Sequence, residues 1–189
     1  MGKKFYISDL HYGHANAISF DNRPFRTVDE MNAALINNWN YAVEKDDTVY
    51  ILGDMFWCKT SEAVSVMDRL NGLKYLITGN HDRIGRDSEL RSRFVGIKDY
   101  AEIKDDGRNV VLCHYPIPCF KNHYYGWYHL YGHVHSSFEW NMMESVKRQM
   151  IELYDKHCRM YNVGAMMPYM NYTPRTLNEI LEEAGNGPV

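Results

Sequence analysis

Seven side chains with nitrogen or oxygen donor atoms stand out because each lies at or just after the end of a short apolar run. They are Asp9, His11, Asp54, Asn80, His114, His133 and His135. Imidazoles mixed with carboxylate and amide oxygens suit manganese, iron, zinc or nickel better than calcium or magnesium. Seven donors also exceed what one tetrahedral zinc ion needs. The set therefore predicts two divalent transition-metal ions that share a bridging carboxylate, with manganese or iron favoured.

Two such ions have a definite chemistry. Held about 3.5 to 4 Å apart, they carry a hydroxide between them, polarise phosphoryl oxygens and stabilise an in-line displacement at phosphorus. We therefore expect an enzyme that hydrolyses phosphate esters.

Five predicted strands deliver these donors. They are the runs 4–8, 48–52, 73–78, 110–113 and 127–131, which are rich in β-branched and aromatic residues. A helix that begins at Thr27, with Glu30 completing a capping box, separates the first two strands, and a helix over 61–70 ends at Asn71-Gly72. This alternation predicts parallel strands, whose carboxyl ends meet where ligands bind in open α/β sheets.

The remaining elements are a hairpin turning at 105–108, a helix over 142–157, a strand over 160–163 and a C-terminal helix. Thr176 and Glu179 give that last helix a second capping box. A chain of 189 residues fits one core, and its sequence shows no repeat or linker. We expect one α/β domain over residues 1–189.

The donors fall into five motifs along the chain. In order these are Asp9-x-His11, Gly53-Asp54, Gly79-Asn80-His81-Asp82, a single His114, and Gly132-His133-x-His135. Together they resemble the calcineurin-like metallophosphoesterase superfamily, in its small, single-domain, bacterial-type form. The resemblance implies an α/β fold in which a two-sheet β-sandwich is flanked by helices, in four layers.

The resemblance also implies the allocation of the ligands. One metal ion would be bound by Asp9, His11 and His135, the other by Asn80, His114 and His133, and Asp54 would bridge the two.

Two further residues gain catalytic roles from the resemblance. His81 would contact the phosphate and protonate the leaving group as a general acid, and Asp82 would orient the His81 ring and sustain its charge. His14 extends the first motif, and we include it with Asn80 and His81 as a possible substrate-binding residue.

Simpler interpretations remain for single residues. A lone strand-end histidine is often a hydrogen-bonded structural residue, and Asp and Asn favour turns and helix caps. His14 would equally hydrogen-bond within its own loop. The aromatic segment 115–127 would either wall the site and stack on a substrate or pack as a covering loop. Arg23 and Arg26 would bind phosphate or, as isolated arginines often do, lie in solvent.

Composition and charge narrow the partners. The sequence is 45% hydrophobic and its formal charge is −3, which two divalent cations would change to +1. This balance disfavours nucleic acid without excluding it. The predicted metal chemistry makes a small phosphorylated substrate the expected partner. The four cysteines form no CxxC pair, and no apolar run is long enough for a membrane span. We expect a cytoplasmic protein without a membrane partner.

The sequence therefore predicts a hydrolase for a phosphomonoester or small phosphodiester, with a metal-bridging hydroxide as the nucleophile. One alternative is a nuclease of the same superfamily, and another is a metal-binding scaffold without catalysis. The physiological substrate and the oligomeric state are not indicated by any motif.

Overall fold

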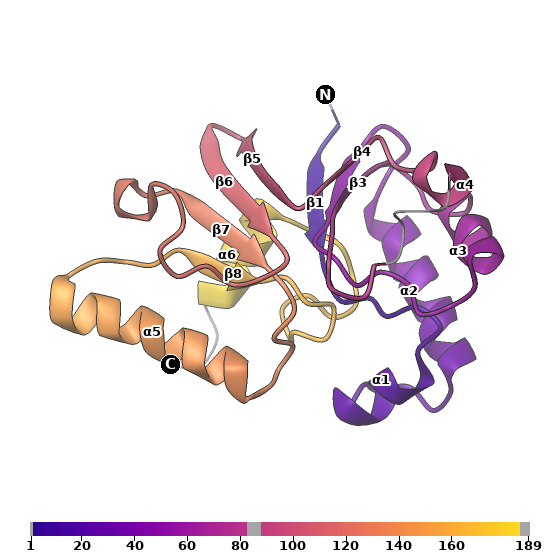
Figure 1. The fold of residues 1–189 in the computed structure, drawn as a ribbon, viewed down its shortest axis with the longest axis horizontal. Helices are drawn as coiled ribbons and strands as arrows, with labels where there is room; N and C mark the ends of the chain where they lie inside the picture. The colour runs from indigo at the N-terminus through magenta and orange to yellow at the C-terminus, as the bar shows by residue number, and fades with distance from the viewer. Residues whose placement is uncertain (1, 83–87, 186–189) are drawn as a thin grey trace.

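Two mixed β-sheets form the centre of the computed structural model, which describes residues 2–82 and 88–185 (Figure 1). The first sheet has the order β4-β3-β2-β1-β9. In it β1 (Lys4–Ile7), β2 (Thr48–Ile51), β3 (Leu73–Ile77) and β4 (Gly96–Lys98) are parallel, and β9 (Arg175–Thr176) is antiparallel to β1.

The second sheet has the order β5-β6-β7-β8. Its parallel strands are β6 (Arg108–Cys113), β7 (Tyr128–Tyr131) and β8 (Met160–Asn162), and β5 (Tyr100–Asp105) is antiparallel to β6. The predicted hairpin at 105–108 is the β5–β6 turn, where Asp106 and Gly107 have φ angles of 46° and 79°.

Helices flank both sheets. They are α1 (Ala15–Phe20), α2 (Val28–Ala42), α3 (Thr60–Met67), α4 (Ser88–Arg91), α5 (Phe138–Tyr154) and α6 (Leu177–Gly185), with a short 3₁₀ helix, η2 (His123–Tyr125). Figure 1 shows α2, α3 and α4 beside the first sheet and α5 beside the second. The predicted α/β fold of two sheets flanked by helices is therefore confirmed. No helix in the described part of the chain combines the length and apolar character that a bilayer crossing requires.

Polar caps set where the helices begin. Thr27 Oγ1 accepts the Glu30 amide at 3.1 Å, as predicted for α2, and Thr176 and Glu179 form the predicted capping box of α6. Helix α5 begins earlier than predicted because Ser137 caps it, its hydroxyl accepting the Glu139 amide at 3.1 Å.

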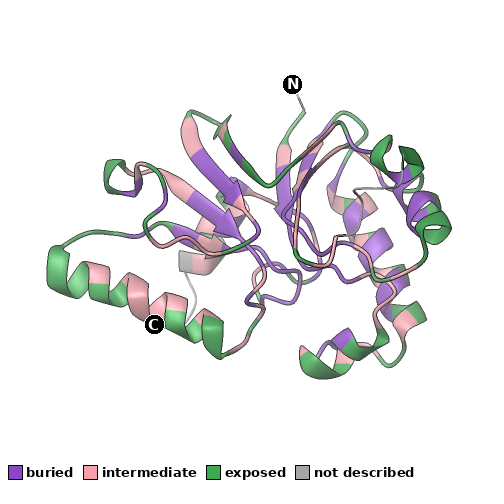
Figure 2. Ribbon diagram, in the orientation of Figure 1, coloured by how far each residue is buried: buried purple, intermediate pink, exposed green. Residues whose placement is uncertain are grey.

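The largest part of the core lies between and around the sheets. Tyr6, Tyr50 and Tyr75 stack across the first sheet, with ring centroids 5.8 and 5.2 Å apart. The Tyr6 hydroxyl donates to Asp105 at the end of β5, so this face points to the second sheet. A smaller cluster lies under α5 and comprises Val111, Phe120, Tyr131, Val134, Cys158 and Met160. Figure 2 shows that α5 itself has only intermediate and exposed residues.

Candidate metal centre

The candidate site lies where the carboxyl ends of both sheets meet. Ser8, the residue after β1, donates its amide to the Val163 carbonyl after β8 at 2.8 Å, and accepts the Ala165 amide at 2.8 Å. The chain following β1 is thereby fixed against the second sheet. Asp9 consequently lies beside His133, whose amide donates to its carboxylate at 3.0 Å although 124 positions separate the two residues.

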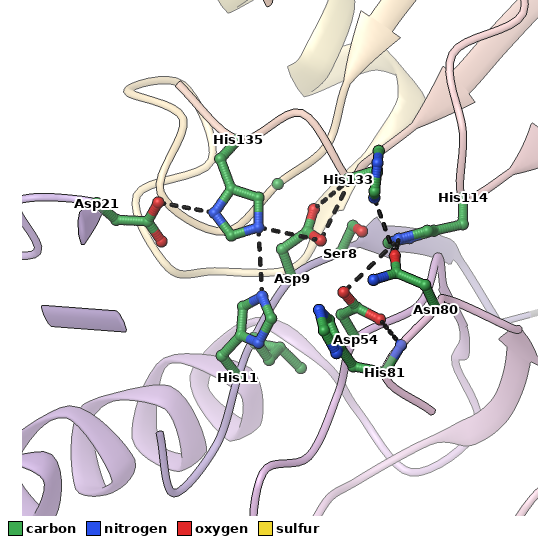
Figure 3. A network of polar contacts seen from close by, with 12 residues as sticks. Ser8, Asp9, His11, Asp21, Asp54, Asn80, His81, His114, His133 and His135 are labelled. Carbon is green, nitrogen blue, oxygen red and sulfur yellow. Dashed lines mark hydrogen bonds and ion pairs between the residues drawn. The ribbon is translucent and has the colours of Figure 1, made fainter. Parts of the chain in front are cut away.

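One group of donors forms around the first motif (Figure 3). His11 Nε2 lies 3.2 Å from His135 Nε2, which lies 3.6 Å from Asp9 Oδ1. One donor atom from each of these three residues lies within 4.8 Å of the other two. The structure thus brings together the three residues predicted to bind the first ion.

A second group forms around the amide of Asn80. Its Oδ1 lies 3.0 Å from His114 Nε2 and 2.9 Å from His133 Nδ1. Asp54 Oδ2 lies 3.7 Å from His114 Nε2. Donor atoms of Asp9, Asp54 and His114 also lie within 4.8 Å of one another, so Asp9 is near both groups. The bridging role of Asp54 remains a prediction.

The hydrogen bonds of the outer ring nitrogens show that a cation fits this arrangement. His114 Nδ1 donates to the Leu52 carbonyl at 2.7 Å, so the neutral ring has its lone pair on Nε2, facing Asn80 Oδ1. His135 Nδ1 donates to Asp21 at 2.7 Å, which leaves the lone pair of its Nε2 facing Asp9 and His11. In both places a lone pair faces another lone pair with no hydrogen between them. A metal ion bound between such atoms would accept both lone pairs, so these atoms suit a metal site.

The backbone of these loops is strained in a shared way. Five of the seven predicted ligands have left-handed φ angles between 48° and 70°: Asp9, His11, Asp54, His133 and His135. This conformation costs a residue other than glycine on the order of 1 kcal/mol or more. Strained residues of this kind cluster at ligand-binding and active sites. Their concentration among the predicted ligands is therefore consistent with a binding site.

Two motif glycines allow the loops to approach closely. A Cβ atom at Gly132 would lie 1.9 Å from Ser8 Oγ and 2.5 Å from Asp9 Oδ2, and one at Gly79 would lie 2.3 Å from Asp54 Oδ1. Neither position can hold a larger residue unless a carboxylate moves. Both glycines are therefore needed for the positions of Asp9 and Asp54.

Burial controls the ionisation of the centre. Burial lowers the pKa of His11 to about 2, helped by the charges of His135 and Arg23, and it also lowers the pKa of His133. Burial raises the pKa of Asp9, although His135 and His114 oppose this shift. Burial would lower the pKa of His135, but Asp21 and Asp9 raise it overall. Burial thus disfavours charge on His11, His133 and Asp9, and a bound cation would stabilise the charged carboxylate of Asp9.

His81 lies at the edge of the donor groups. Its ring is 6.1 Å from that of His11 and 4.8 Å from that of Trp57, centroid to centroid. The carboxylate of Asp82 accepts the amides of Asp54 at 3.0 Å, Met55 at 3.1 Å and Gly79 at 2.8 Å, and its role in orienting the His81 ring remains a prediction. These three bonds fix the loop that carries Asp54.

His14 reaches the site only indirectly. Its ring stacks on Trp57, with centroids 4.2 Å apart and planes at 9°, and its Nδ1 is buried without a hydrogen-bond partner among the described residues. The ring centroid of His11 lies 5.6 Å away. His14 thus borders the donor groups, and its role in substrate binding remains a prediction.

Two residues support the centre in roles that the sequence did not predict. Asp21, at the end of α1, binds His135 and also accepts Arg23 Nε at 3.0 Å and Nη2 at 2.8 Å. Arg23 further donates to the carbonyls of Asp9 and Leu10, and it is 4% exposed. Arg23 therefore neither lies in solvent nor has free donors for phosphate, because it braces the loop of Asp9.

The aromatic segment 115–127 was expected either to wall the site or to pack as a covering loop, and different residues of it do each. Phe120 is buried over the second sheet, and His129 Nε2 accepts the Ile117 amide at 3.1 Å, so this part of the segment packs as a covering loop. Tyr115 alone of these residues contacts a predicted ligand, with its ring 4.6 Å from that of His133.

Comparisons with known proteins match this geometry. The family described as calcineurin-like phosphoesterase matches residues 5–163. The uncharacterized protein MJ1445 of Methanocaldococcus jannaschii is 37% identical over 139 residues, covering 72% of each chain. The gene 66 protein of Mycobacterium phage L5 is 38% identical over 85 residues, which are 43% of this chain and 41% of that protein. The solved structure of AQ665 from Aquifex aeolicus, a protein of unknown function, shares the fold with a TM-score of 0.63 and 22% identity, over 97% of this chain and 100% of that one.

Proposed function

Because this chain belongs to the calcineurin-like phosphoesterase family, we propose that it hydrolyses a phosphomonoester or a small phosphodiester with two bound divalent transition-metal ions. The observation that supports this most is the convergence of potential ligand atoms, with Asn80 Oδ1 facing two imidazole nitrogens and His11 Nε2 facing His135 Nε2. Manganese or iron suits such mixed donors best. When bound, the two ions supply Lewis acidity that activates water and offsets charge on the phosphoryl oxygens.

The proposed division of the ligands is the one that the family resemblance implies. The first ion is assigned to Asp9, His11 and His135, the second to Asn80, His114 and His133, with Asp54 between them. Leu52 and Asp21 fix the tautomers of His114 and His135, so both rings present Nε2 to the ion without rearrangement.

His81 is the proposed general acid. Its amide is held by Asp54 Oδ1 at 2.9 Å, which ties the position of the acid to that of the bridging carboxylate. The His81 ring donates a proton to the ester oxygen as the alcohol departs. Asp82 contributes as a positioning residue, because it binds the amides on either side of this loop.

The test uses metal-stripped protein reloaded with Mn²⁺ and four substrates, namely p-nitrophenyl phosphate, phenyl phosphate, bis(p-nitrophenyl) phosphate and single-stranded DNA. We expect turnover only after reloading, and loss of turnover in Asp54→Asn. His81→Gln should lose about 10²- to 10⁴-fold on phenyl phosphate and less on p-nitrophenyl phosphate, whose leaving group needs no proton. The exposed His157, replaced by glutamine, is the matched control and should behave as the wild type.

Each outcome bears on a different part of the proposal. Equal losses on both aryl esters in His81→Gln would remove its role as an acid. Turnover by stripped protein would contradict metal dependence. A strong preference for DNA would favour a nuclease, and metal binding without any turnover would favour a scaffold.

A further inference from the structure

This inference rests on the proposed function and concerns the part of the substrate that is not phosphate. We propose that the substrate carries a flat aromatic group of nucleobase size, held between Phe20 and Phe138 beside the metal ligands, so that the substrate class is a nucleoside monophosphate ester.

A cavity of about 490 Å³ connects the two rings to the centre. Phe20 and Phe138 line it from the end of α1 and the start of α5, and His133 and His135 form another part of its wall. Its volume lies within the range of small-molecule sites, about 300 to 1,000 Å³. Because two predicted metal ligands line it, an ester bound at the metals extends naturally into this space.

The two phenylalanines are largely exposed, although large apolar side chains are usually buried. Phe20 is 52% exposed and Phe138 is 72% exposed. The Phe20 ring lies 5.6 Å from that of His135, and the backbone of Phe138 is fixed because this residue is the first of a capped helix. Exposed aromatic rings at the border of a polar site are typical of ligand recognition, because they stack on a planar group without strict specificity.

The other aromatic rings near the centre are less available. Trp57 has one face covered by the stacked ring of His14, at 4.2 Å and 9°. Tyr115 packs against the ring of His133, at 4.6 Å. Trp57 is still 42% exposed and lines a separate cavity of about 420 Å³ with His81, but the Phe20–Phe138 pair has more exposed rings and shares its cavity with the predicted ligands His133 and His135.

Charge favours a single phosphate with an uncharged base. The described lining of the cavity contains Asp21 and Glu139 but neither lysine nor arginine. The second and third phosphates of a nucleoside di- or triphosphate would therefore have no cationic side chain to bind in this cavity. The lack of lysine and arginine also disfavours a longer nucleic acid. Asn22 and Ser136 supply polar groups for the edge of a base.

The test compares two substrates that differ only in the base. Adenosine 5′-monophosphate and ribose 5-phosphate have the same ester bond to the same kind of alcohol. For the Mn²⁺-loaded enzyme we expect kcat/KM to be at least about tenfold higher with the base, since stacking on one aromatic ring has an effect of this order. If only diesters react, thymidine 5′-(p-nitrophenyl phosphate) and 2-deoxyribose 5-(p-nitrophenyl phosphate) form the equivalent pair.

Variants then locate the contact. In the double variant Phe20→Ala, Phe138→Ala the preference for the base should fall to less than about twofold, and Phe20→Leu should show whether a flat ring or only apolar volume is needed. Tyr41→Ala is the control, because Tyr41 is an aromatic residue that is 93% exposed on α2 and does not line this cavity. It should retain the full preference.

The outcomes separate this inference from the proposed function. Hydrolysis of both substrates at equal kcat/KM, or a preference that survives the double variant, would overturn the aromatic site while leaving the phosphoesterase intact. Absence of all hydrolysis by the Mn²⁺-loaded enzyme would instead refute the proposed function.

Discussion

Asp21→Asn is the substitution that isolates the contribution of the residues behind the metal ligands. The carboxylate of Asp21 is buried, accepts His135 Nδ1 at 2.7 Å and pairs with Arg23 at 2.8 Å. Asparagine keeps its shape and one oxygen but removes its charge. The Arg23 guanidinium, whose side chain is fully buried, then loses its neutralising partner and repels a cation at His135. Both effects weaken metal binding.

The expected size follows from these contacts. Loss of a partner behind a metal-binding histidine typically weakens the affinity about 10- to 100-fold, or about 1.4 to 2.7 kcal/mol. Arg23 keeps its bonds to the carbonyls of Asp9 and Leu10, so we expect the variant to fold. Competition with a fluorescent Mn²⁺ chelator measures the affinity, and thermal unfolding of the metal-free protein measures the stability.

The matched control is Asp68→Asn. Asp68 also pairs with an arginine, Arg93, at 2.7 Å, but its side chain is 52% exposed and the pair lies on the surface. We expect an unchanged Mn²⁺ affinity and a stability change below about 1 kcal/mol. If Asp21→Asn binds Mn²⁺ as tightly as the wild type does, then Asp21 does not support His135 and this part of the reasoning is wrong.

Two further predictions concern pH and packing. Burial lowers the pKa of His129 to about 4, so between pH 6.5 and 4 the unfolded chain takes up a proton that the folded ring does not. The free energy of unfolding should therefore decrease as the pH falls, by about 1.4 kcal/mol per pH unit from this residue. Urea titrations at several pH values should give His129→Gln a smaller change of this free energy with pH than the wild type shows. An equal change in both proteins would contradict the lowered pKa of His129. Gly132→Ala places a methyl group 2.5 Å from Asp9 Oδ2 and should abolish Mn²⁺ binding in the same competition assay. Gly107→Ala, whose new Cβ has no neighbour within 4 Å, should affect only stability.

The sequence was informative about the centre because strand ends are predictable. Each predicted ligand closes or follows an apolar run, and parallel strands bring their carboxyl ends to one edge. The resemblance to the calcineurin-like family then implied how the donors would group, and Asp9, His11 and His135 do lie together.

The supporting contacts had no local signal. Asp21 lies 114 positions before His135, in a turn after a helix, where aspartate is common for other reasons. Arg23 looked like an isolated charge because its partners are two backbone carbonyls and a carboxylate that only the fold brings together. Similarly, β9 contains only Arg175 and Thr176 and is a strand because β1 offers it a free edge.

Crystals soaked in Mn²⁺ and measured at the manganese absorption edge test the central claim most directly. Two anomalous peaks are expected, one among Asp9, His11 and His135 and the other among Asn80, His114 and His133, with a carboxylate between them. A site that stays empty, or that holds a single ion while the second group of donors remains unbound, would contradict the two-metal centre.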